Sequence, residues 1–264
     1  MKAGMAPRGP VLRPCSLSGF TYQLDPYIGC EYRCHYCYTL NQTGTNWENG
    51  ILIHPDLVEE LDRELSSLAP QKIYMGWNTD PYQPAERGRR QTRQALELLL
   101  RRGFSACVLT KSDLITRDVD LFRQMPDSSV GVSIAFQDEE TRRYFEPKAP
   151  PNKRRLTALK ALKEAGIRTY LLICPVMPFI ANVEALIQQV APVADTIWIY
   201  PLQFKEREDR NWQLVEEILC RHFPDLKESY GEIAFSTAHP YWAELRRKLH
   251  SLKEKLGTDL RIEL

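Results

Sequence analysis

Short apolar, β-branched segments alternate with amphipathic segments along most of this chain. The segments 72–75 and 196–200 are of the first kind and have the length and composition of strands. The segment 55–68 is of the second kind, because its leucines recur every three or four residues, as on one face of a helix. An alternation of strands with amphipathic helices is typical of parallel βα units, so the pattern predicts an α/β fold.

Six strands and five intervening helices can be placed in this way. The predicted strands are 20–24, 72–75, 105–109, 130–136, 168–174 and 196–200, and the predicted helices are 55–68, 91–102, 117–125, 153–165 and 183–190. Six βα units are enough for a partial (β/α)6 TIM-like barrel, which we assign to residues 15–202.

The two ends of the chain lie outside this repeating pattern. Residues 203–264 contain two amphipathic segments, near 209–222 and 241–256, and we expect them to form a C-terminal helical extension packed on the barrel. Residues 1–14 are rich in Pro, Gly and basic residues, and we expect a mobile N-terminal arm there.

The composition excludes some classes of protein. Of the 264 residues, 43% are hydrophobic, which is ordinary for a globular protein. No apolar run approaches the roughly 20 residues that span a bilayer, so we expect no membrane partner. The 35 Lys and Arg nearly balance the 34 Asp and Glu, so no overall field draws the chain to nucleic acid. Seven cysteines, an odd number, and residues 1–14 without an apolar core predict reduced thiols and a cytoplasmic location.

Three of these cysteines lie close together in the chain. Cys30, Cys34 and Cys37 have the spacing C-x3-C-x2-C, which lets three thiolates bind one [4Fe–4S] cluster and leaves its fourth iron without a protein ligand. Ordinary ferredoxin sites and structural zinc sites are instead closed by four protein ligands. The alternative is therefore a zinc site in which Cys15 or His35 supplies the fourth ligand.

Polar motifs follow the predicted strands, where the reactive groups of such barrels collect. They are Thr79-Asp-Pro-Tyr-Gln-Pro84, Leu109-Thr-Lys-Ser112, Val130-Gly-Val-Ser133 and Glu146-Pro-Lys-Ala-Pro150. Together with the cysteine spacing, these motifs resemble the radical S-adenosylmethionine (SAM) superfamily, and within it the spore photoproduct lyase-related family, often labelled DNA repair photolyases. The resemblance runs from about residue 25 to residue 186.

This resemblance implies a function and a set of binding residues. It implies an enzyme that holds a [4Fe–4S] cluster through Cys30, Cys34 and Cys37, binds SAM, and generates a 5′-deoxyadenosyl radical that abstracts hydrogen from a substrate. It implies that residues around SAM are Tyr36 near the adenine, Thr79, Lys111 and Ser133 near the methionine end, and Arg155 as a partner for a carboxylate. Asp80 and Glu146 are expected to hold these cations in place.

The chain departs from the family at two places. Photoproduct lyases carry a hydrogen-donating cysteine three residues before the aspartate that matches Asp80, and this chain has Trp77 there. Cys174 is the best replacement donor, although a small buried hydrophobic side chain is the alternative reading of it. The loop 178–182 also lacks the family's Gly and Asn-Asp pair, which bears on the shape of the substrate pocket.

Nucleic acid at the barrel mouth is the expected substrate class by resemblance, with a peptide or small metabolite as the alternative. Cations begin two predicted helices, and phosphate would offset their unfavourable interaction with the helix dipole; pairing with nearby acids or simple solvation is the competing explanation. These cations are Arg87, Arg89, Arg90 and Arg93 in one helix and Lys153, Arg154 and Arg155 in the other. Trp47, Trp77 and Tyr82 could stack on a base, or could line the core or the SAM pocket.

Two further expectations concern partners and the class of protein. A radical SAM enzyme of this kind implies an electron donor such as flavodoxin or ferredoxin. The competing class is a non-catalytic binding module that a zinc ion or a cluster stabilises.

Overall fold

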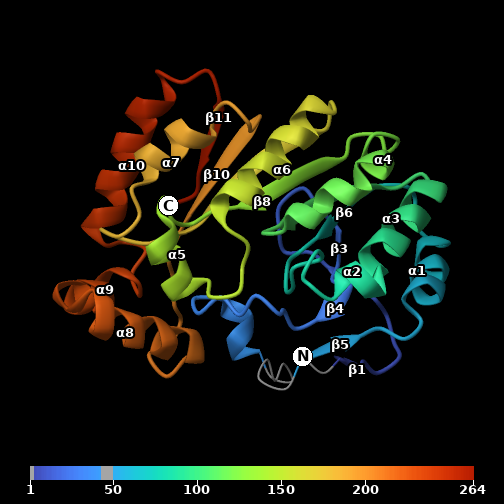
Figure 1. Cartoon of the computed structure of the whole chain (residues 1–264), viewed down its shortest axis with the longest axis horizontal. Coiled ribbons are helices and arrows are strands. Elements are labelled where there is room, and N and C mark those ends of the chain that lie inside the picture. The colour runs from blue at the N-terminus through green and yellow to red at the C-terminus, as the bar shows by residue number, and fades with distance from the viewer. Residues whose placement is uncertain (1–2, 43–49) are drawn as a thin grey trace.

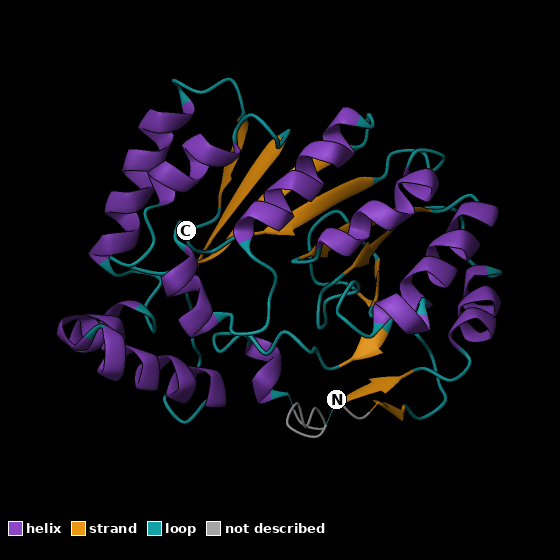
Figure 2. Cartoon of the chain, viewed as in Figure 1, coloured by secondary structure: helices purple, strands orange, loops and turns teal. Residues whose placement is uncertain are grey.

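The computed structural model describes residues 3–42 and 50–264, so Trp47 lies outside the described residues. An eight-stranded sheet with the order β11-β10-β9-β8-β7-β6-β3-β2 runs through the centre (Figures 1 and 2). Its strands are β2 (Leu12–Pro14), β3 (Tyr22–Leu24), β6 (Lys72–Met75), β7 (Ser105–Thr110), β8 (Ser129–Ser133), β9 (Arg168–Val176), β10 (Thr196–Pro201) and β11 (Asp259–Ile262).

Neighbouring strands from β3 to β11 are parallel, and β2 pairs antiparallel with β3. The six predicted strands are the six consecutive strands β3, β6, β7, β8, β9 and β10 of this sheet. The two ends of the strand order, β2 and β11, do not pair with each other, so the sheet remains open. The prediction of a partial TIM-like barrel is therefore confirmed.

Helices pack on the outside of this sheet. The helices α8, α9 and α10 lie at the left of the view, on the side of the sheet that holds β10 and β11 (Figure 1). The α-helices are α1 (Leu57–Leu65), α2 (Glu86–Arg89), α3 (Gln91–Arg101), α4 (Val119–Phe122), α5 (Glu139–Phe145), α6 (Asn152–Glu164), α7 (Val183–Val190), α8 (Arg210–His222), α9 (Lys227–Ile233) and α10 (Pro240–Lys253). Three short 3-10 helices are η1 (Tyr38–Asn41), η2 (Asp113–Asp118) and η3 (Pro224–Leu226).

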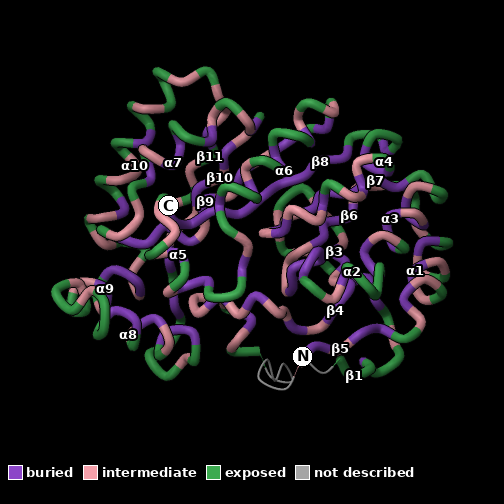
Figure 3. The backbone as a smooth tube through the Cα atoms, in the orientation of Figure 1, coloured by how far each residue is buried: buried purple, intermediate pink, exposed green. Residues whose placement is uncertain are grey.

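The alternation of side chains along β10 shows how the barrel wall is built. Ile197 and Ile199 are fully buried and belong to the larger core cluster, which joins β8, β9 and β10 to the helices α5 to α10. Trp198 and Tyr200 point to the other face and line the barrel interior. Figure 3 shows the same division over the part of the chain that the structure describes, with buried strands inside and exposed helix faces outside.

Three parts of the fold differ from the predictions. Residues 3–14 are not a free arm, because β1 (Ala3–Met5) pairs with β5 (Ile51–Ile53) and β2 pairs with β3. Together with β4 (Tyr27–Ile28), β1 and β5 form a separate three-stranded sheet. The C-terminal extension is not only helical, because β11 adds a strand to the edge of the main sheet.

The third difference is local: the predicted helix 117–125 contains only the last two residues of the 3-10 helix η2 and the short helix α4, which ends at Phe122. Among residues 3–42 and 50–264, no helix combines the length and the apolar character of a membrane span.

Candidate functional site

A cavity of about 270 Å³ lies at the carboxyl ends of the central strands, against the cysteine loop. Parallel strands end at the same edge, so residues far apart in the chain meet there. Eight of the nine residues that the sequence nominated line this cavity: Cys30, Cys34, Tyr36, Cys37, Thr79, Lys111, Ser133 and Cys174. The ninth, Arg155, does not line it.

Hydrogen bonds to the loop after β6 hold the cysteine loop in place. Gly29 begins the turn with a φ of 85°, in the left-handed region that favours glycine. Its carbonyl oxygen accepts hydrogen bonds from Thr79 Oγ1 at 2.5 Å and from Gln83 Nε2 at 3.2 Å. The amide of Glu31 donates to Gln83 Oε1 at 2.8 Å. Thr79 therefore lines the cavity and at the same time fixes the start of the cysteine loop.

The three thiols suit a positively charged multi-iron group. All seven cysteines are free, and burial raises the pKa of the Cys34 thiol to about 12 and that of Cys30 well above its usual value. Thiols in such surroundings become thiolates when a metal replaces the proton. The three cysteines line a cavity of about 270 Å³, which has room for a group larger than a single ion.

The structure does not support the zinc alternative. Among residues 3–42 and 50–264, no three His, Cys, Asp or Glu side chains converge to hold a single ion. Neither Cys15 nor His35, the two candidates for a fourth ligand, lines the cavity that the three cysteines line.

A buried set of charges supports one wall of the cavity. The ammonium of Lys111 bonds Ser133 Oγ at 3.1 Å and lies 3.9 Å from Glu146 Oε1. Burial alone would lower the pKa of Lys111, but Glu146 and Cys34 hold it above its usual value. Burial would raise the pKa of Glu146, but Arg155 and Lys111 hold it below its usual value. Two cations thus share one carboxylate, and the set favours the arrival of an anion beside Lys111.

Arg155 supports this wall from behind. Its guanidinium is fully buried and donates to Pro150 O and Ser133 O, both at 2.8 Å, and to Glu146 Oε2 at 2.5 Å. Arg155 therefore binds the carboxylate of Glu146 and does not line the cavity, and its contact with a bound carboxylate stays a prediction. The expectation that Glu146 holds the cations fits the geometry, and the phenol of Tyr36 also donates to Glu146.

Asp80 orders the strand ends through the main chain. Its carboxylate is buried and accepts from Thr110 Oγ1 at 2.6 Å, from the Tyr82 amide at 2.8 Å and from the Lys111 amide at 2.7 Å. Burial raises its pKa despite these bonds. Asp80 therefore positions Lys111 through the backbone, not through the ammonium that we expected it to hold.

A second cavity, of about 420 Å³, lies deeper in the barrel, toward the amino ends of the strands. Its lining shares Tyr38, Trp77 and Cys174 with the first cavity, so the two are adjacent. Sequence reasoning missed most of its walls, including Cys107 and Tyr170. The available signal was the period-two alternation of the predicted strands, which gives the inward-facing positions.

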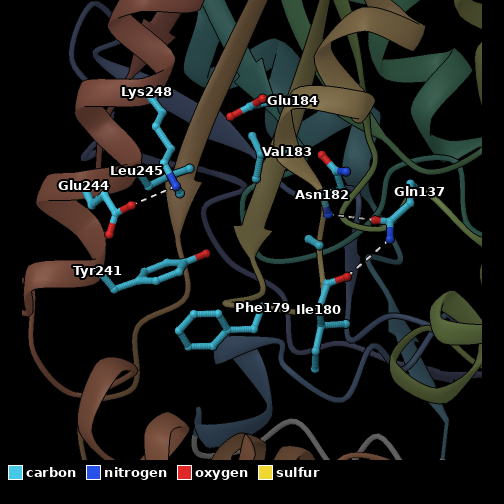
Figure 4. Close-up of a pocket in the computed structure, with 11 residues that line it drawn as sticks. Gln137, Phe179, Ile180, Asn182, Val183, Glu184, Tyr241, Glu244, Leu245 and Lys248 are labelled. Carbon is cyan, nitrogen blue, oxygen red and sulfur yellow. Dashed lines mark hydrogen bonds and ion pairs between the residues drawn. The ribbon is translucent and has the colours of Figure 1, made fainter.

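The loop 178–182 lines neither of these cavities. It borders a separate hollow of about 420 Å³ outside the barrel, between α7 and α10 (Figure 4). Phe179 is 60% exposed there, has a φ of 60°, and packs edge-on against Tyr241 with ring centroids 5.0 Å apart. The departure of this loop from the family pattern therefore changes an outer surface, and the walls of the two barrel cavities come from other segments.

The two described aromatic residues that were candidates for base stacking have different surroundings in the structure. Trp77 lines both barrel cavities. Tyr82 is fully buried and donates to Asp118 Oδ2 at 2.9 Å, so its proposed stacking role is wrong and its core alternative is correct.

The cations at the starts of the two helices also fall into two groups, those paired with acids and those exposed to solvent. Arg93 pairs with Asp118 at 2.7 Å, and Arg154 pairs with Asp113 at 2.7 Å. Pairing with nearby acids therefore accounts for these two cations and for Arg155. The cations Arg87, Arg89, Arg90 and Lys153 are exposed.

Comparisons with known proteins agree with this site. A family model described as the radical SAM superfamily matches residues 24–187. An uncharacterised protein of Methanocaldococcus jannaschii is 30% identical over 252 residues, which cover 92% of this chain and 90% of that protein.

Two solved structures share the fold. A spore photoproduct lyase mutant with bound SAM and dinucleoside spore photoproduct has a TM-score of 0.75 and 17% identity, over 99% of this chain and 81% of that one. The Streptococcus suis protein SuiB bound to its precursor peptide SuiA has a TM-score of 0.59 and 13% identity, over 93% of this chain and 49% of that one.

The family model covers more than half of the chain, and its span contains the cysteine loop and the strand ends that form the first cavity. The chain therefore belongs to the radical SAM superfamily, whose members are enzymes that use a [4Fe–4S] cluster and SAM.

Proposed function

We propose that this protein cleaves SAM reductively in the first cavity and uses the resulting radical to take a hydrogen atom from a nucleic-acid substrate. One observation carries the proposal: three cysteines of one loop and three polar side chains from the ends of adjacent strands line the same cavity. The polar side chains are Thr79, Lys111 and Ser133. The cluster, when bound, would supply the electron that converts SAM to a 5′-deoxyadenosyl radical.

The residues of the chain bind and orient the cofactors in this proposal. Cys30, Cys34 and Cys37 would hold the [4Fe–4S] cluster. Lys111, with Ser133 bonded to its ammonium at 3.1 Å, receives the carboxylate of SAM, and the neighbouring cation Arg155 keeps Glu146 from neutralising it completely. The ring of Tyr36 borders the cavity near the adenine.

A nucleic acid related to the photoproduct substrates of the lyases is the leading substrate class, because the lyase fold covers 99% of this chain. Modification of a peptide is the second candidate, supported by the fold shared with peptide-bound SuiB. A flavodoxin or ferredoxin would supply the electron. Free thiols at all seven cysteines agree with a cytoplasmic location.

The test begins with anaerobic reconstitution of the protein with iron and sulfide, reduction with dithionite, and addition of SAM. We expect about four irons per chain by elemental analysis and formation of 5′-deoxyadenosine by mass spectrometry. Deuterated candidate substrates, a dinucleoside photoproduct and a peptide, are then compared for transfer of deuterium into 5′-deoxyadenosine. A colourless, zinc-loaded protein that leaves SAM intact would refute the proposal.

We also propose that Cys174 donates the hydrogen atom, because Trp77 stands where the lyases carry their hydrogen-donating cysteine. Cys174 lines both cavities, and burial raises the pKa of its thiol to about 11, so it stays protonated and can give a hydrogen atom. The assay is turnover of a dinucleoside spore photoproduct. Because the lyase cysteine is replaced, we expect few clean turnovers in the wild type and fewer still in Cys174→Ala, with the exposed Cys220→Ala as the control. Many clean turnovers that are insensitive to Cys174→Ala would refute the argument from Trp77.

A further inference from the structure

The deeper barrel cavity has an unusually aromatic wall. Its volume of about 420 Å³ lies in the range of ~300–1,000 Å³ that small-molecule sites occupy. Seven aromatic side chains line it: Phe20, Tyr38, Tyr74, Trp77, Tyr170, Trp198 and Tyr200. They come from the three strands β6, β9 and β10 and from segments between elements and the 3-10 helix η1, so the wall is a product of the tertiary fold.

Several of these rings are held at the distances at which aromatic groups associate. The rings of Trp198 and Tyr200 are nearly parallel, with an interplanar angle of 16° and centroids 6.3 Å apart. On β6 and the loop that follows it, the rings of Tyr74 and Trp77 meet edge to face with centroids 5.9 Å apart. Aromatic pairs prefer such offset or edge-on arrangements at about 4.5–7 Å, and a further flat ring could join either pair.

The position of the Tyr170 ring in this wall depends on the glycine at residue 131. A Cβ atom on Gly131 would lie 2.2 Å from the ring of Tyr170, so the glycine lets that ring lie flat against β8. The phenol of Tyr170 donates to Val108 O at 3.0 Å, which fixes the ring there. A bulkier residue at 131 would force the ring inward and fill the cavity.

The charged residues of the lining are already paired. Arg168 lies 3.1 Å from Asp127, and Arg261 lies 2.8 Å from Asp259. Both arginine side chains are largely exposed to solvent, and Asp127 also pairs with Lys72, so these charges lie at the surface and the aromatic interior offers little to a phosphate or a carboxylate. A ligand that enters gains by burying uncharged flat surface.

The position of the cavity also suggests how a ligand enters. Its lining includes Leu17 and Phe20 from the β2–β3 connection and Arg261 from β11. β2 and β11 are the two unpaired edges of the open sheet. The cavity therefore lies behind the seam where the barrel does not close, and a ring attached to a larger molecule can pass through this seam while the rest stays outside.

We infer that the deeper cavity binds an uncharged planar ring of the substrate, inserted through the seam between the β2 and β11 edges and stacked against Trp198 and Tyr200. The inference rests on the proposed function only in that it makes this ring the group presented to the first cavity. A nucleobase and the aromatic side chain of a peptide share this chemistry, and the experiment separates them.

The experiment measures binding of small probes to the reconstituted protein by ligand-observed NMR titration. Thymidine and N-acetyltyrosinamide supply a ring from each source, thymidine 5′-monophosphate adds a charge, and myo-inositol has no aromatic ring. We expect saturable binding of at least one uncharged ring probe, at one site per chain, and none of myo-inositol. The tighter of the two ring probes identifies the source of the ring.

The variant Trp198→Leu removes a stacking ring and keeps an apolar side chain. It should weaken ring binding by about tenfold or more, the loss expected for one stacking partner. Phe179→Leu is the matched control, because it removes an exposed ring from the outer hollow of Figure 4 and should leave binding unchanged. Equal binding to wild type and Trp198→Leu would overturn the inference, and so would binding of thymidine 5′-monophosphate tenfold tighter than thymidine.

A measurement on the unchanged protein guards against misfolding of the variant. Photocrosslinking with 4-thiothymidine, mapped by mass spectrometry, should label residues of the cavity lining on β6, β9 or β10. Labelling elsewhere, or no binding of either ring probe, would overturn the inference. Iron content and SAM cleavage by the wild type are recorded without any probe. Their failure would refute the proposed function, whereas their success with failed ring binding would refute this inference alone.

Discussion

Arg155 offers the sharpest test of the wall behind the first cavity, because an arginine beside it serves as a matched control. Arg155 and Arg154 are consecutive residues in the first turn of α6, and each pairs with a carboxylate. The side chains of Arg155 and its partner Glu146 are fully buried, whereas 51% of the Arg154 side chain is exposed. Replacing each arginine by methionine keeps most of the aliphatic stem and removes only the charge and the donors.

The two losses should differ in size. Arg155→Met leaves a buried carboxylate whose remaining partners are the Tyr36 phenol and Lys111 at 3.9 Å, and it removes the donors of Ser133 O and Pro150 O. Breaking a buried pair from one side costs about 3–5 kcal/mol, and this includes the cost of the uncompensated charge. The exposed pair of Arg154 is worth roughly 0–1 kcal/mol after screening by solvent.

The assay is urea denaturation of the cofactor-free protein under reducing conditions, so that cofactor loss does not enter the free energy of unfolding. We expect Arg155→Met to be destabilised by at least about 3 kcal/mol relative to wild type, and Arg154→Met by less than about 1 kcal/mol. Equal free energies of unfolding for the two variants would refute the reasoning, because burial is what distinguishes the two pairs.

Three further predictions concern the first cavity. Changing any one of the three loop cysteines to alanine should remove the cluster iron and abolish SAM cleavage, whereas Cys15→Ala should not; iron loss in Cys15→Ala would mean that four protein ligands close the site. Lys111→Ala should weaken SAM binding by about 1.5–3 kcal/mol in a titration of the cluster-loaded protein, and an unchanged affinity would show that the carboxylate binds elsewhere.

The pKa of Glu146 lies below its usual value, so its contribution to stability is present above its unfolded pKa and is lost as pH falls through the folded value; Glu146→Gln should therefore flatten the acid side of the stability profile.

The amino-acid sequence by itself determined the elements and their order. The periodicity of the apolar residues predicted the helix 183–190 and the strand 72–75 with the bounds that α7 and β6 have. It did so because local backbone preference and one-sided burial leave their mark within a few residues of chain. The cysteine spacing indicated the chemistry for a similar reason, since three ligands within eight residues need little help from the rest of the fold.

The tertiary structure decided which side chains face the cavities. From the sequence, Arg155 and Lys111 were both candidates to bind a carboxylate. Only the fold shows that Arg155 is buried against Glu146, whereas Lys111 lines the cavity. The strands β1, β2 and β11 were also missed, because each is defined by its partner across a sheet rather than by a local pattern of apolar residues. The aromatic wall of the deeper cavity gathers residues from 20 to 200, and no local pattern records that these distant positions share one interior.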